Sequence, residues 1–466
     1  MQLYDAVSPL DYRYYGSDWE LFERLKPYVT EKAYVGYLAK VEAALVKTMA
    51  KYGICNQAIA QDVENACSDI DPEAVYAEEQ RIQHNIRALV NCIKRKVSQE
   101  ANPYLHLFAT SADIMDTASA LRFKDLFHKV VIPDLLQLES LLIGLARQSK
   151  DMGQTGRTHG QYAVPITFGH TWAEYVSRLG NRIELIHQAA GNLRGQLSGA
   201  VGVSNSLALV AKQYKLSPLQ FERDVLAELG LTPSTHSTQI VEPEYVTDLA
   251  YAVASAFGVL ANLADDVRHL ERSEISELRE ADDPDRVGSS TMPHKVNPKD
   301  YENVKSLWKA FMPRMTTLFL DQISEHQRDL TNSASGRFVM ELFVGFISAV
   351  KRLNKSLAKI EVNQEKVRYH LDQTKETSIA EGIYTLLALS GLPTGYEYIH
   401  KLSSRCRMSG ERLVDALQSD PTMQVFWRNL PEEQKDVLLN PEKYTGIAAE
   451  KTAACCDYWE GRLKNM

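Results

Sequence analysis

The stretch of the chain with the greatest chemical potential is Arg286 to Pro298, which reads RVGSSTMPHKVNP. Its glycine and prolines argue against a helix or a central strand, so this stretch is predicted to be a loop. Two serines, a lysine and an asparagine lie between Gly288 and Pro298. Loops with polar groups this closely spaced are often functional, although an inert connection is the alternative.

Three other segments have a similar density of polar residues. They are QHNIRALV with His84, ATSADIMDTA with Thr110, Ser111 and Asp113, and GQTGRTHGQYAVP with Arg157, Thr158 and His159. Each also has a purely structural interpretation. A lone histidine such as His84 is often a satisfied helical residue, and the second segment could simply cap a helix. The glycines around His159 could serve only to shape a turn.

Motif spacing excludes several kinds of site. Lys295 has no glycine before it and no serine or threonine after it, unlike the lysine of a phosphate-binding P-loop. No lysine lies three residues after Ser289 or Ser290, and GVSNS at 202–206 lacks the final glycine of a hydrolase elbow. There is no H-E-x-x-H motif and no G-x-G-x-x-G after a strand. We therefore expect no metal and no cofactor.

The residue types that remain suit the removal of a proton from carbon next to a carboxylate. Such a step places a second negative charge on the carboxylate, and Lys295, Asn297 and loop amides could stabilise it. A serine is a poor base in water, but nearby cations and amides favour its alkoxide. A separate histidine could then deliver a proton to the leaving group.

Long helices are expected to position these groups, because apolar residues recur at steps of three and four along three segments. The stripes are Trp172, Val176, Leu179, Ile183, Ile186, Ala190 and Leu193; Leu249, Val253, Ala256, Leu260, Leu263, Val267 and Leu270; and Val339, Leu342, Phe346, Val350, Leu353, Leu357 and Ile360. This periodicity predicts an all-α fold with a central long-helix bundle, which subunits could share. Strands should be few.

Three domains are expected along the chain. They are an N-terminal helical domain at 1–111, the central long-helix bundle at 112–362, and a C-terminal helical domain at 363–466. Shorter amphipathic stretches make up the last domain, broken by SGLPTGYEY and LPEEQ.

Composition places the chain among ordinary soluble globular proteins. Of its 466 residues 44% are hydrophobic and 24% charged, and the net charge of −8 argues against general binding to nucleic acid or to a membrane surface. No run of about 18 apolar residues predicts a membrane span, and the first residues do not resemble a signal peptide. The six cysteines form no C-x-x-C pair, so free thiols and a cytoplasmic location are expected.

Several of these motifs carry a family resemblance. GSSTMPHKVNP resembles the signature loop of the fumarase/aspartase superfamily. TSADIMDTA, GRTHGQYAVPITFG, the early SPLDYRY and QRDLTNSASGR at 327–337 resemble elements of its adenylosuccinate lyase family. The likeness spans residues 8 to about 365 and is loose beyond them. It implies a three-domain helical fold of the fumarase/aspartase type.

The resemblance implies a base and an acid on separate segments. Ser289 would be the general base on a mobile loop, with Ser290 as the fallback. His159 would be the general acid at the leaving nitrogen, oriented by Glu302. His84 would assist substrate binding.

The substrate contacts that the resemblance implies form two groups. The succinyl part would be held by Lys295, Asn297, Thr110, Ser111, Thr158 and Gln239. The 5′-phosphate would be held by Arg13, Tyr14, Arg328, Ser333 and Arg337. Arginine suits this second role because its planar guanidinium matches phosphate geometry. A bound phosphate would also separate this chain from fumarase and aspartase.

The implied activity is β-elimination of fumarate from adenylosuccinate, giving AMP, and from the succinylated carboxamide intermediate of purine synthesis (SAICAR), giving AICAR. The partners would be this small-molecule substrate and identical subunits, as a homotetramer whose active sites each draw on three subunits. Two positions depart from the family pattern: Asn85 stands where aspartate often follows His84, and Asn303 where many members have arginine. The alternatives are a lyase for another succinyl-amine, such as argininosuccinate, and a non-catalytic helical scaffold.

Overall fold

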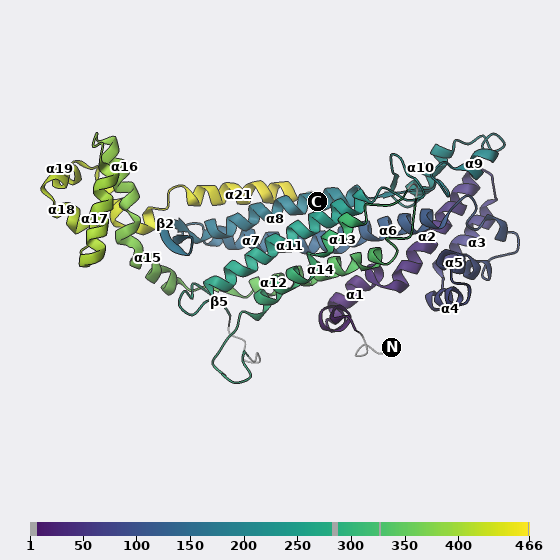
Figure 1. The fold of residues 1–466 in the computed structure, drawn as a ribbon, viewed down its shortest axis with the longest axis horizontal. Coiled ribbons are helices and arrows are strands. Elements are labelled where there is room, and N and C mark those ends of the chain that lie inside the picture. The colour runs from purple at the N-terminus through teal and green to yellow at the C-terminus, as the bar shows by residue number, and fades with distance from the viewer. Residues whose placement is uncertain (1–6, 282–287, 326–327, 465) are drawn as a thin grey trace. The chain divides into compact units, whose positions relative to one another are not determined.

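The computed structural model describes residues 7–281, 288–325, 328–464 and 466 (Figure 1). The chain divides into two compact units, each assembled from three segments. Unit 1 comprises Met1–Leu135, Arg182–Leu260 and Lys305–Lys351. Unit 2 comprises Leu136–Asn181, Ala261–Val304 and Arg352–Met466. Helices dominate both units, which confirms the all-α prediction.

Unit 1 contains mainly short and medium-length helices. They are α1 (Trp19–Val29), α2 (Glu31–Lys51), α3 (Gln57–Ser68), α4 (Pro72–Ile82), α5 (Asn85–Lys94), α6 (Ser111–Leu126), α9 (Asn205–Val210), α10 (Pro218–Glu228) and α13 (Arg314–Leu320). Single turns of other helix types occupy Leu10–Gly16, Asn102–Tyr104, Phe127–Val131 and Ser335–Phe338. The two-residue strands β3 (Arg194–Gly195) and β4 (Thr232–Pro233) pair in parallel.

Five helices contribute residues to both units. They are α7 (Ile132–Gln148), α8 (Phe168–Gly191), α11 (Glu244–Leu270), α12 (Lys299–Phe311) and α14 (Val339–Leu357). The predicted apolar stripes lie on α8, α11 and α14, and nearly all their residues are buried. The helices are slightly shorter than the stripes, because Leu193 lies beyond the end of α8 and Ile360 belongs to a strand, where it pairs with Glu280.

Unit 2 holds the remaining elements. They are β1 (Gly153–Thr158), β2 (Gln161–Thr167), β5 (Leu278–Glu280), β6 (Ile360–Val362), α15 (Gln364–Ser378), α16 (Ala380–Leu389), α17 (Gly395–Ser409), α18 (Leu413–Ser419), α19 (Pro421–Asn429), α20 (Glu432–Leu439), a 3-10 turn (Pro441–Lys443) and α21 (Ala448–Leu463). Strands β1 and β2 form an antiparallel hairpin, and β5 pairs with β6. The described strands are few and short, as expected.

Local capping explains where several helices of unit 1 begin. Side chains of Asp18, Thr30, Asn56 and Asp71 accept hydrogen bonds from amides of the first turns of α1 to α4, at 2.9–3.1 Å. These interactions satisfy amides that have no partner within the helix. Polar residues before apolar periodic stretches therefore define the helix starts.

Aromatic side chains hold α14 in the core of unit 1. The ring of Phe343 meets the rings of Phe123 and Phe127 edge to face, with centroids 5.3 and 4.9 Å apart. Phe346, one turn further on, packs against Phe257 of α11 at 5.5 Å. Edge-to-face pairs at these distances add about 0.5–1.5 kcal/mol to the gain from burial.

The last helix, α21, packs closely on α8 within unit 2. A Cβ atom at Gly180 of α8 would lie 2.4 Å from the ring of Trp459, so the absence of a side chain permits this approach. The thiol of Cys455 also points at the carbonyl of Ala173, 3.5 Å away. The C-terminal helix is thus anchored by small-to-large packing.

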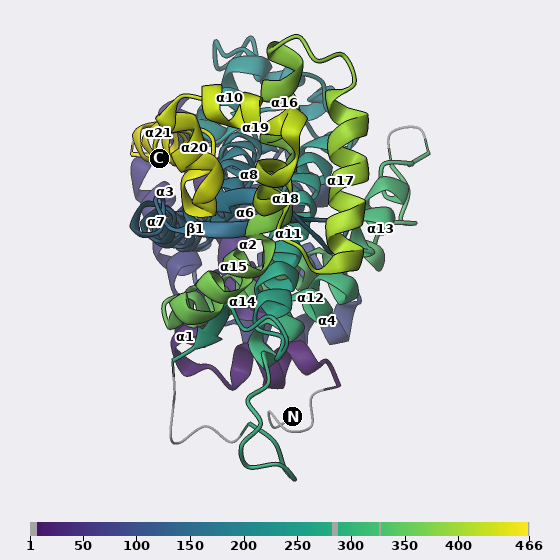
Figure 2. The same cartoon turned by 90° about the vertical axis from the view of Figure 1, so that its left-hand side faces the viewer.

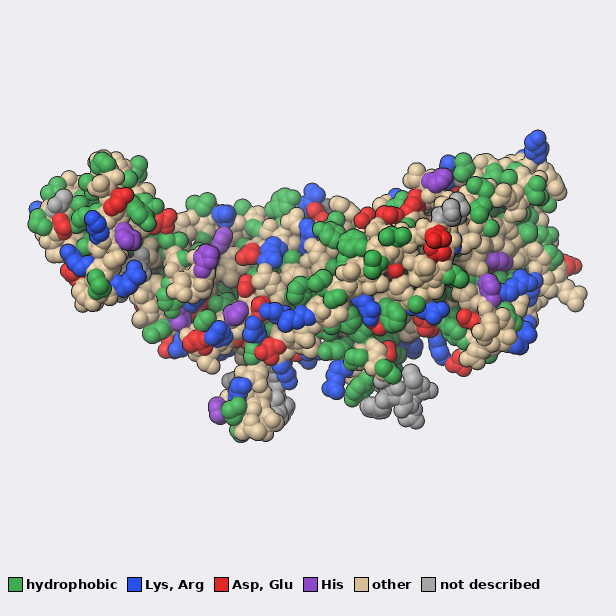
Figure 3. All heavy atoms as spheres, viewed as in Figure 1, with side chains coloured by type: hydrophobic (Ala, Val, Ile, Leu, Met, Phe, Trp, Pro, Cys, Tyr) green, Lys and Arg blue, Asp and Glu red, His purple; other side chains and the backbone are tan. Residues whose placement is uncertain are grey.

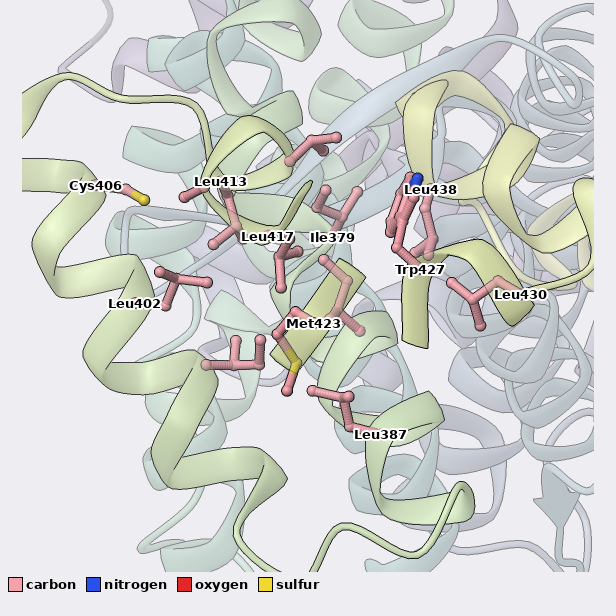
Figure 4. Close-up of a cluster of buried hydrophobic side chains, with 14 residues drawn as sticks. Ile379, Leu387, Leu402, Cys406, Leu413, Leu417, Met423, Trp427, Leu430 and Leu438 are labelled. Atoms are coloured by element: carbon pink, nitrogen blue, oxygen red, sulfur yellow. The ribbon is translucent and has the colours of Figure 1, made fainter. Parts of the chain in front are cut away.

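Helices α16 to α20 surround a separate apolar cluster (Figures 2 and 4). Its buried side chains come from residues 379–438 and include Ile379, Leu417, Met423 and Trp427. Helix α16 ends at Leu389 and α19 ends at Asn429, and the two predicted turns follow these residues. The boundaries expected for the three domains stay a prediction.

By length and composition one described helix, α11, could cross a membrane. However, 67% of its most apolar window is buried against other parts of the chain, as is typical of a core helix. The six cysteines are free thiols, as expected.

Glu139 on α7 is an unusual member of the core. Its side chain is 1% exposed, and both carboxylate oxygens are buried without a hydrogen-bond partner. Burial raises the pKa of Glu139 to about 9. The folded chain thus holds this carboxyl group protonated at neutral pH, whereas the unfolded chain would release the proton.

This difference predicts a pH-dependent loss of stability that Glu139→Gln should remove. Because the pKa of the folded state lies above that of the unfolded state, stability is greatest below the unfolded value and falls as pH rises toward 9. Glu139 alone contributes a slope of up to about 1.4 kcal/mol per pH unit. Chemical denaturation at pH 5, 7 and 8.5 measures it.

The matched control is Glu450→Gln, since Glu450 is exposed on α21. Its pH dependence should follow that of the unaltered chain. A Glu139→Gln variant that loses stability with pH as steeply as the unaltered chain would contradict the assignment.

Candidate active site

The proposed acid, His159, lies at the tip of the β1–β2 hairpin. Thr158 pairs with Gln161, which leaves His159 and Gly160 as a two-residue turn. Their φ angles are 55° and 71°, the left-handed values that a type I′ hairpin turn requires at both central positions. A residue other than glycine is uncommon there, and such strain is concentrated at functional sites. The turn exposes His159 and Thr158 to solvent.

A bulge at Gly156 shapes the hairpin below this turn. The strand register shifts between Thr155 and Arg157. A Cβ atom on Gly156 would lie 2.4 Å from the carbonyl oxygen of Val164, so only glycine fits without movement. The glycines around His159 therefore do shape a turn, and they place the histidine at its apex.

The loop at 288–298 has no helix or strand, as predicted, and stands clear of the neighbouring surface (Figures 1 and 3). The hydroxyl oxygen of Ser289 accepts the amides of Thr291 and Met292, at 3.3 and 3.1 Å. Donors of this kind stabilise negative charge on an oxygen. Ser290 and Lys295 are exposed.

Asn297 fastens the two ends of this loop. Its side-chain amide donates to the carbonyl of Gly288 at 2.9 Å. A Cβ atom at Gly288 would lie 2.1 Å from the carbonyl oxygen of Lys295, so glycine permits this close approach. In the free chain the amide of Asn297 thus serves the loop itself.

Glu302 is exposed in the first turn of α12, which follows the loop. Within the described part of the chain, no hydrogen bond joins Glu302 to His159 or His159 to Ser289. Orientation of the histidine by this carboxylate stays a prediction.

In unit 1, Thr110 and Ser111 stand at the start of α6. The backbone amide of Thr110 donates to the carboxylate of Asp113 at 2.8 Å, the capping interaction that the sequence suggests. The same buried carboxylate accepts the amides of Ser198 and Gly199, at 3.0 and 3.1 Å. Burial raises the pKa of Asp113, while these amides act in the opposite direction.

Gln239 lies in the loop before α11. Its side chain donates to the carbonyl of Ala200 at 2.9 Å, and its own carbonyl accepts the side chain of Gln196. Gln239 thus contacts the segment 196–200, which also contains the two amides that donate to Asp113.

His84 has a capping role that its structural interpretation anticipates. It is the N-cap of α5, and its Nδ1 accepts the amide of Arg87 at 3.2 Å. The next residue, Asn85, donates through its side chain to the sulfur of Met115 at 3.2 Å. Any part of His84 in substrate binding would be additional to capping.

The predicted phosphate residues occupy two segments of unit 1. Arg13 is exposed and Tyr14 half-buried in the π-helical turn Leu10–Gly16. Ser333 and Arg337 are exposed, whereas Arg328 is half-buried. Gln327, at the start of the matching motif, lies outside the described residues.

Arg328 lines a cavity of about 210 Å³ together with Asp116 of α6. Asp116 accepts the amide of Val241 at 3.0 Å. Burial raises the pKa of Asp116 to about 6, although that amide and the charge of Arg328 lower it. The motif TSADIMDTA contains this aspartate, but its sequence position alone did not single it out.

Family comparisons place this arrangement in a class. Residues 14–310 match the family model described as Lyase, and residues 324–445 match the one described as Adenylosuccinate lyase C-terminal. The structure aligns with a 3-carboxy-cis,cis-muconate lactonizing enzyme from Pseudomonas putida with a TM-score of 0.82 and 24% identity, covering 98% of this chain and 99% of that one. A fumarate lyase from Mesorhizobium gives 0.81 and 21%, covering 93% and 97%. These structures share the fold of this chain. The family model over residues 14–310 shows that the chain is a lyase of the fumarase/aspartase superfamily.

Curated relatives specify the family within it. Adenylosuccinate lyase of Pyrococcus horikoshii is 33% identical to this chain over 98% of both proteins. That of Escherichia coli K12 is 28% identical, covering 95% of this chain and 97% of the relative. The chain belongs to the adenylosuccinate lyase family of carbon–nitrogen lyases.

The hairpin predicts different outcomes for one substitution at two glycines. Gly156→Ala should cost about 3 kcal/mol of unfolding free energy, because its methyl group meets a backbone carbonyl that cannot move freely. Gly160→Ala has open space and incurs only the strain of positive φ, about 1 kcal/mol. Denaturant titration measures both, and equal losses would contradict the assigned bulge.

Proposed function

We propose that this protein cleaves adenylosuccinate to AMP and fumarate, and SAICAR to AICAR and fumarate. The match to adenylosuccinate lyases over 98% of the chain carries this proposal. The residues retained on the hairpin and the loop supply the acid, the base and the carboxylate donors that such an elimination needs.

The base is Ser289. Its oxygen removes a proton from the carbon next to a succinyl carboxylate, and the electron pair enters that carboxylate as an aci-carboxylate. The amides of Thr291 and Met292 support the alkoxide because they already donate to this oxygen. Lys295 and Asn297 would neutralise the charge that develops on the carboxylate, once Asn297 exchanges its loop contact for the substrate.

The acid is His159, which stands exposed at the hairpin tip. The electron pair of the aci-carboxylate forms the double bond of fumarate as the carbon–nitrogen bond breaks. The imidazolium of His159 gives its proton to the leaving nitrogen, and Glu302 orients the ring. Thr110, Ser111, Thr158 and Gln239 hold the succinyl part, with His84 assisting.

The substrate is selected through its phosphate. Arg13, Tyr14, Arg328, Ser333 and Arg337 bind this group. Arginine suits it because a guanidinium can donate two parallel hydrogen bonds to phosphate oxygens. Exposure of Arg13 and Arg337 in the free chain leaves their donors available.

The working form is a homotetramer in the cytoplasm, with each active site built from three subunits and without a cofactor. Within the described residues of one chain no hydrogen bond joins His159 to Ser289 or Glu302, and in this proposal contacts between copies bring the acid and the base together. Free cysteines support a reducing compartment.

Ser289→Ala tests the activity and its base together. Loss of fumarate release should exceed about 10³-fold, because the alanine has no oxygen to accept the proton. Binding of AMP should stay near normal. Ultraviolet absorbance follows adenylosuccinate and SAICAR cleavage, with argininosuccinate as the competing substrate.

Ser290→Ala is the control and should keep most of the activity. Equal activity of Ser289→Ala and the unaltered enzyme would exclude Ser289 as the base. Refolding a mixture of inactive Ser289→Ala and His159→Ala chains should restore part of the activity if sites combine subunits. No recovery in the mixture would contradict composite sites.

Arg328→Ala tests phosphate recognition. Its KM for adenylosuccinate should rise by about 10- to 100-fold, since a charge-assisted hydrogen bond contributes about 1.5–3 kcal/mol. The analogue lacking the 5′-phosphate should show no such change. A similar loss for both substrates would show that Arg328 does not contact the phosphate.

A further inference from the structure

The hairpin that carries His159 is fixed by a buried ion pair. The guanidinium of Arg157 donates to Glu277, from Nη2 to Oε1 at 2.6 Å and from Nη1 to Oε2 at 3.2 Å. The carboxylate of Glu277 is fully buried, whereas the Arg157 side chain is 19% exposed. Glu277 lies between α11 and β5, outside the hairpin.

A second donor completes the environment of this carboxylate. The side-chain amide of Gln154 on β1 donates to Oε2 of Glu277 at 2.8 Å. Its amide oxygen accepts the hydroxyl of Thr171 on α8 at 2.7 Å. Glu277 therefore binds two residues of β1, and one of them also binds α8.

The other strand of the hairpin is held by a buried histidine. Tyr162 of β2 lies 2.9 Å from Nδ1 of His370 on α15, measured from its hydroxyl oxygen. Nε2 of His370 lies 2.9 Å from the carbonyl oxygen of Ile275. Because a carbonyl only accepts, Nε2 carries the proton of the neutral ring, and Nδ1 accepts the tyrosine O–H.

The two sets of contacts converge on the segment 275–277. Glu277 holds β1 through Arg157, and the carbonyl of Ile275 holds His370, which holds β2 through Tyr162. Arg157 and Tyr162 also meet each other, with the guanidinium carbon 5.5 Å from the ring centroid. The end of the hairpin next to the turn is thus held by a ring of contacts through Arg157, two residues before His159, and Tyr162, three residues after it.

We propose that Glu277 and His370 are positioning residues for the reaction: through Arg157 and Tyr162 they fix the hairpin whose tip presents His159 to the leaving nitrogen. The inference rests on the proposed function, because the position of this tip affects catalysis only if His159 is the acid. The turn at 159–160 is exposed and has only these two residues, so its direction follows the paired strands that lead into it.

Proton delivery depends on this direction more than substrate binding does. A misplacement of about 1 Å at a reacting group can cost about 100-fold in rate. The proposed succinyl and phosphate contacts come mainly from other segments. Loosening the hairpin should therefore lower kcat and leave KM nearly unchanged.

Tyr162→Phe provides the cleanest test, since it removes one oxygen and keeps the ring beside Arg157. We expect kcat to fall by about tenfold. KM and the thermal midpoint should stay close to those of the unaltered enzyme, and amide exchange across 154–166 should become faster. His370→Phe should lower kcat at least as much, because it removes the contact with Tyr162 and also the contact with the carbonyl of Ile275. The double variant should be little worse than His370→Phe alone, because the tyrosine contact is already lost in that variant.

Tyr398→Phe is the matched control. It removes a tyrosine hydroxyl that donates to Asp420 at 2.5 Å in the C-terminal cluster, and it should leave kcat and hairpin exchange unchanged. Unchanged kcat in Tyr162→Phe and His370→Phe would overturn the inference while the proposed function stands. The inference would also be overturned if kcat and thermal stability fell and KM rose together while amide exchange across the hairpin did not become faster. An unaltered enzyme unable to cleave adenylosuccinate would instead remove the proposed function itself, and the catalytic role of the hairpin with it.

Discussion

Burial of three long apolar stripes is the constraint on which the rest of the structure depends. The helices α8, α11 and α14 each have one apolar face that is buried on folding, and the residues of that face recur at steps of three and four. The packing of these helices determines where the segments that connect to them lie. The hairpin lies directly before α8, and the 288–298 loop lies between α11 and α12. The proposed acid therefore lies on a connection that leads directly into α8, and the proposed base on one that leads directly into α12.

Much of this fold can be predicted from the sequence because helical periodicity is a repeated signal. Each stripe offers several residues in register, so its assignment survives an error at one position. Its ends are less certain, as Ile360 shows: it continues the spacing of the third stripe but pairs with Glu280 in a strand. The burial of Glu139 could not be predicted, since its position on a helix is compatible with either solvent exposure or burial until the packing of that helix is known.

The candidate site likewise contains residues that the sequence identifies and residues that it does not. The motifs singled out Ser289, His159 and Thr110 because reactive and polar types cluster near them. Glu277 and His370 stand alone in the sequence. They lie 120 and 208 residues along the chain from Arg157 and Tyr162, the hairpin residues that they contact. 

Only folding brings such residues to the hairpin, and no local pattern marks them. His84 illustrates the opposite limit, because the same side chain can cap a helix and still belong to a family motif.

The hydrogen bond from Asn297 to Gly288 limits the conformational entropy of the 288–298 loop. Ordering one free residue costs about 1–2 kcal/mol. A segment whose ends are already joined by the Asn297–Gly288 hydrogen bond has surrendered part of that freedom in advance. The loop therefore has less conformational entropy to lose than an unconstrained segment of the same length, until the proposed transfer of Asn297 to the substrate releases this hydrogen bond.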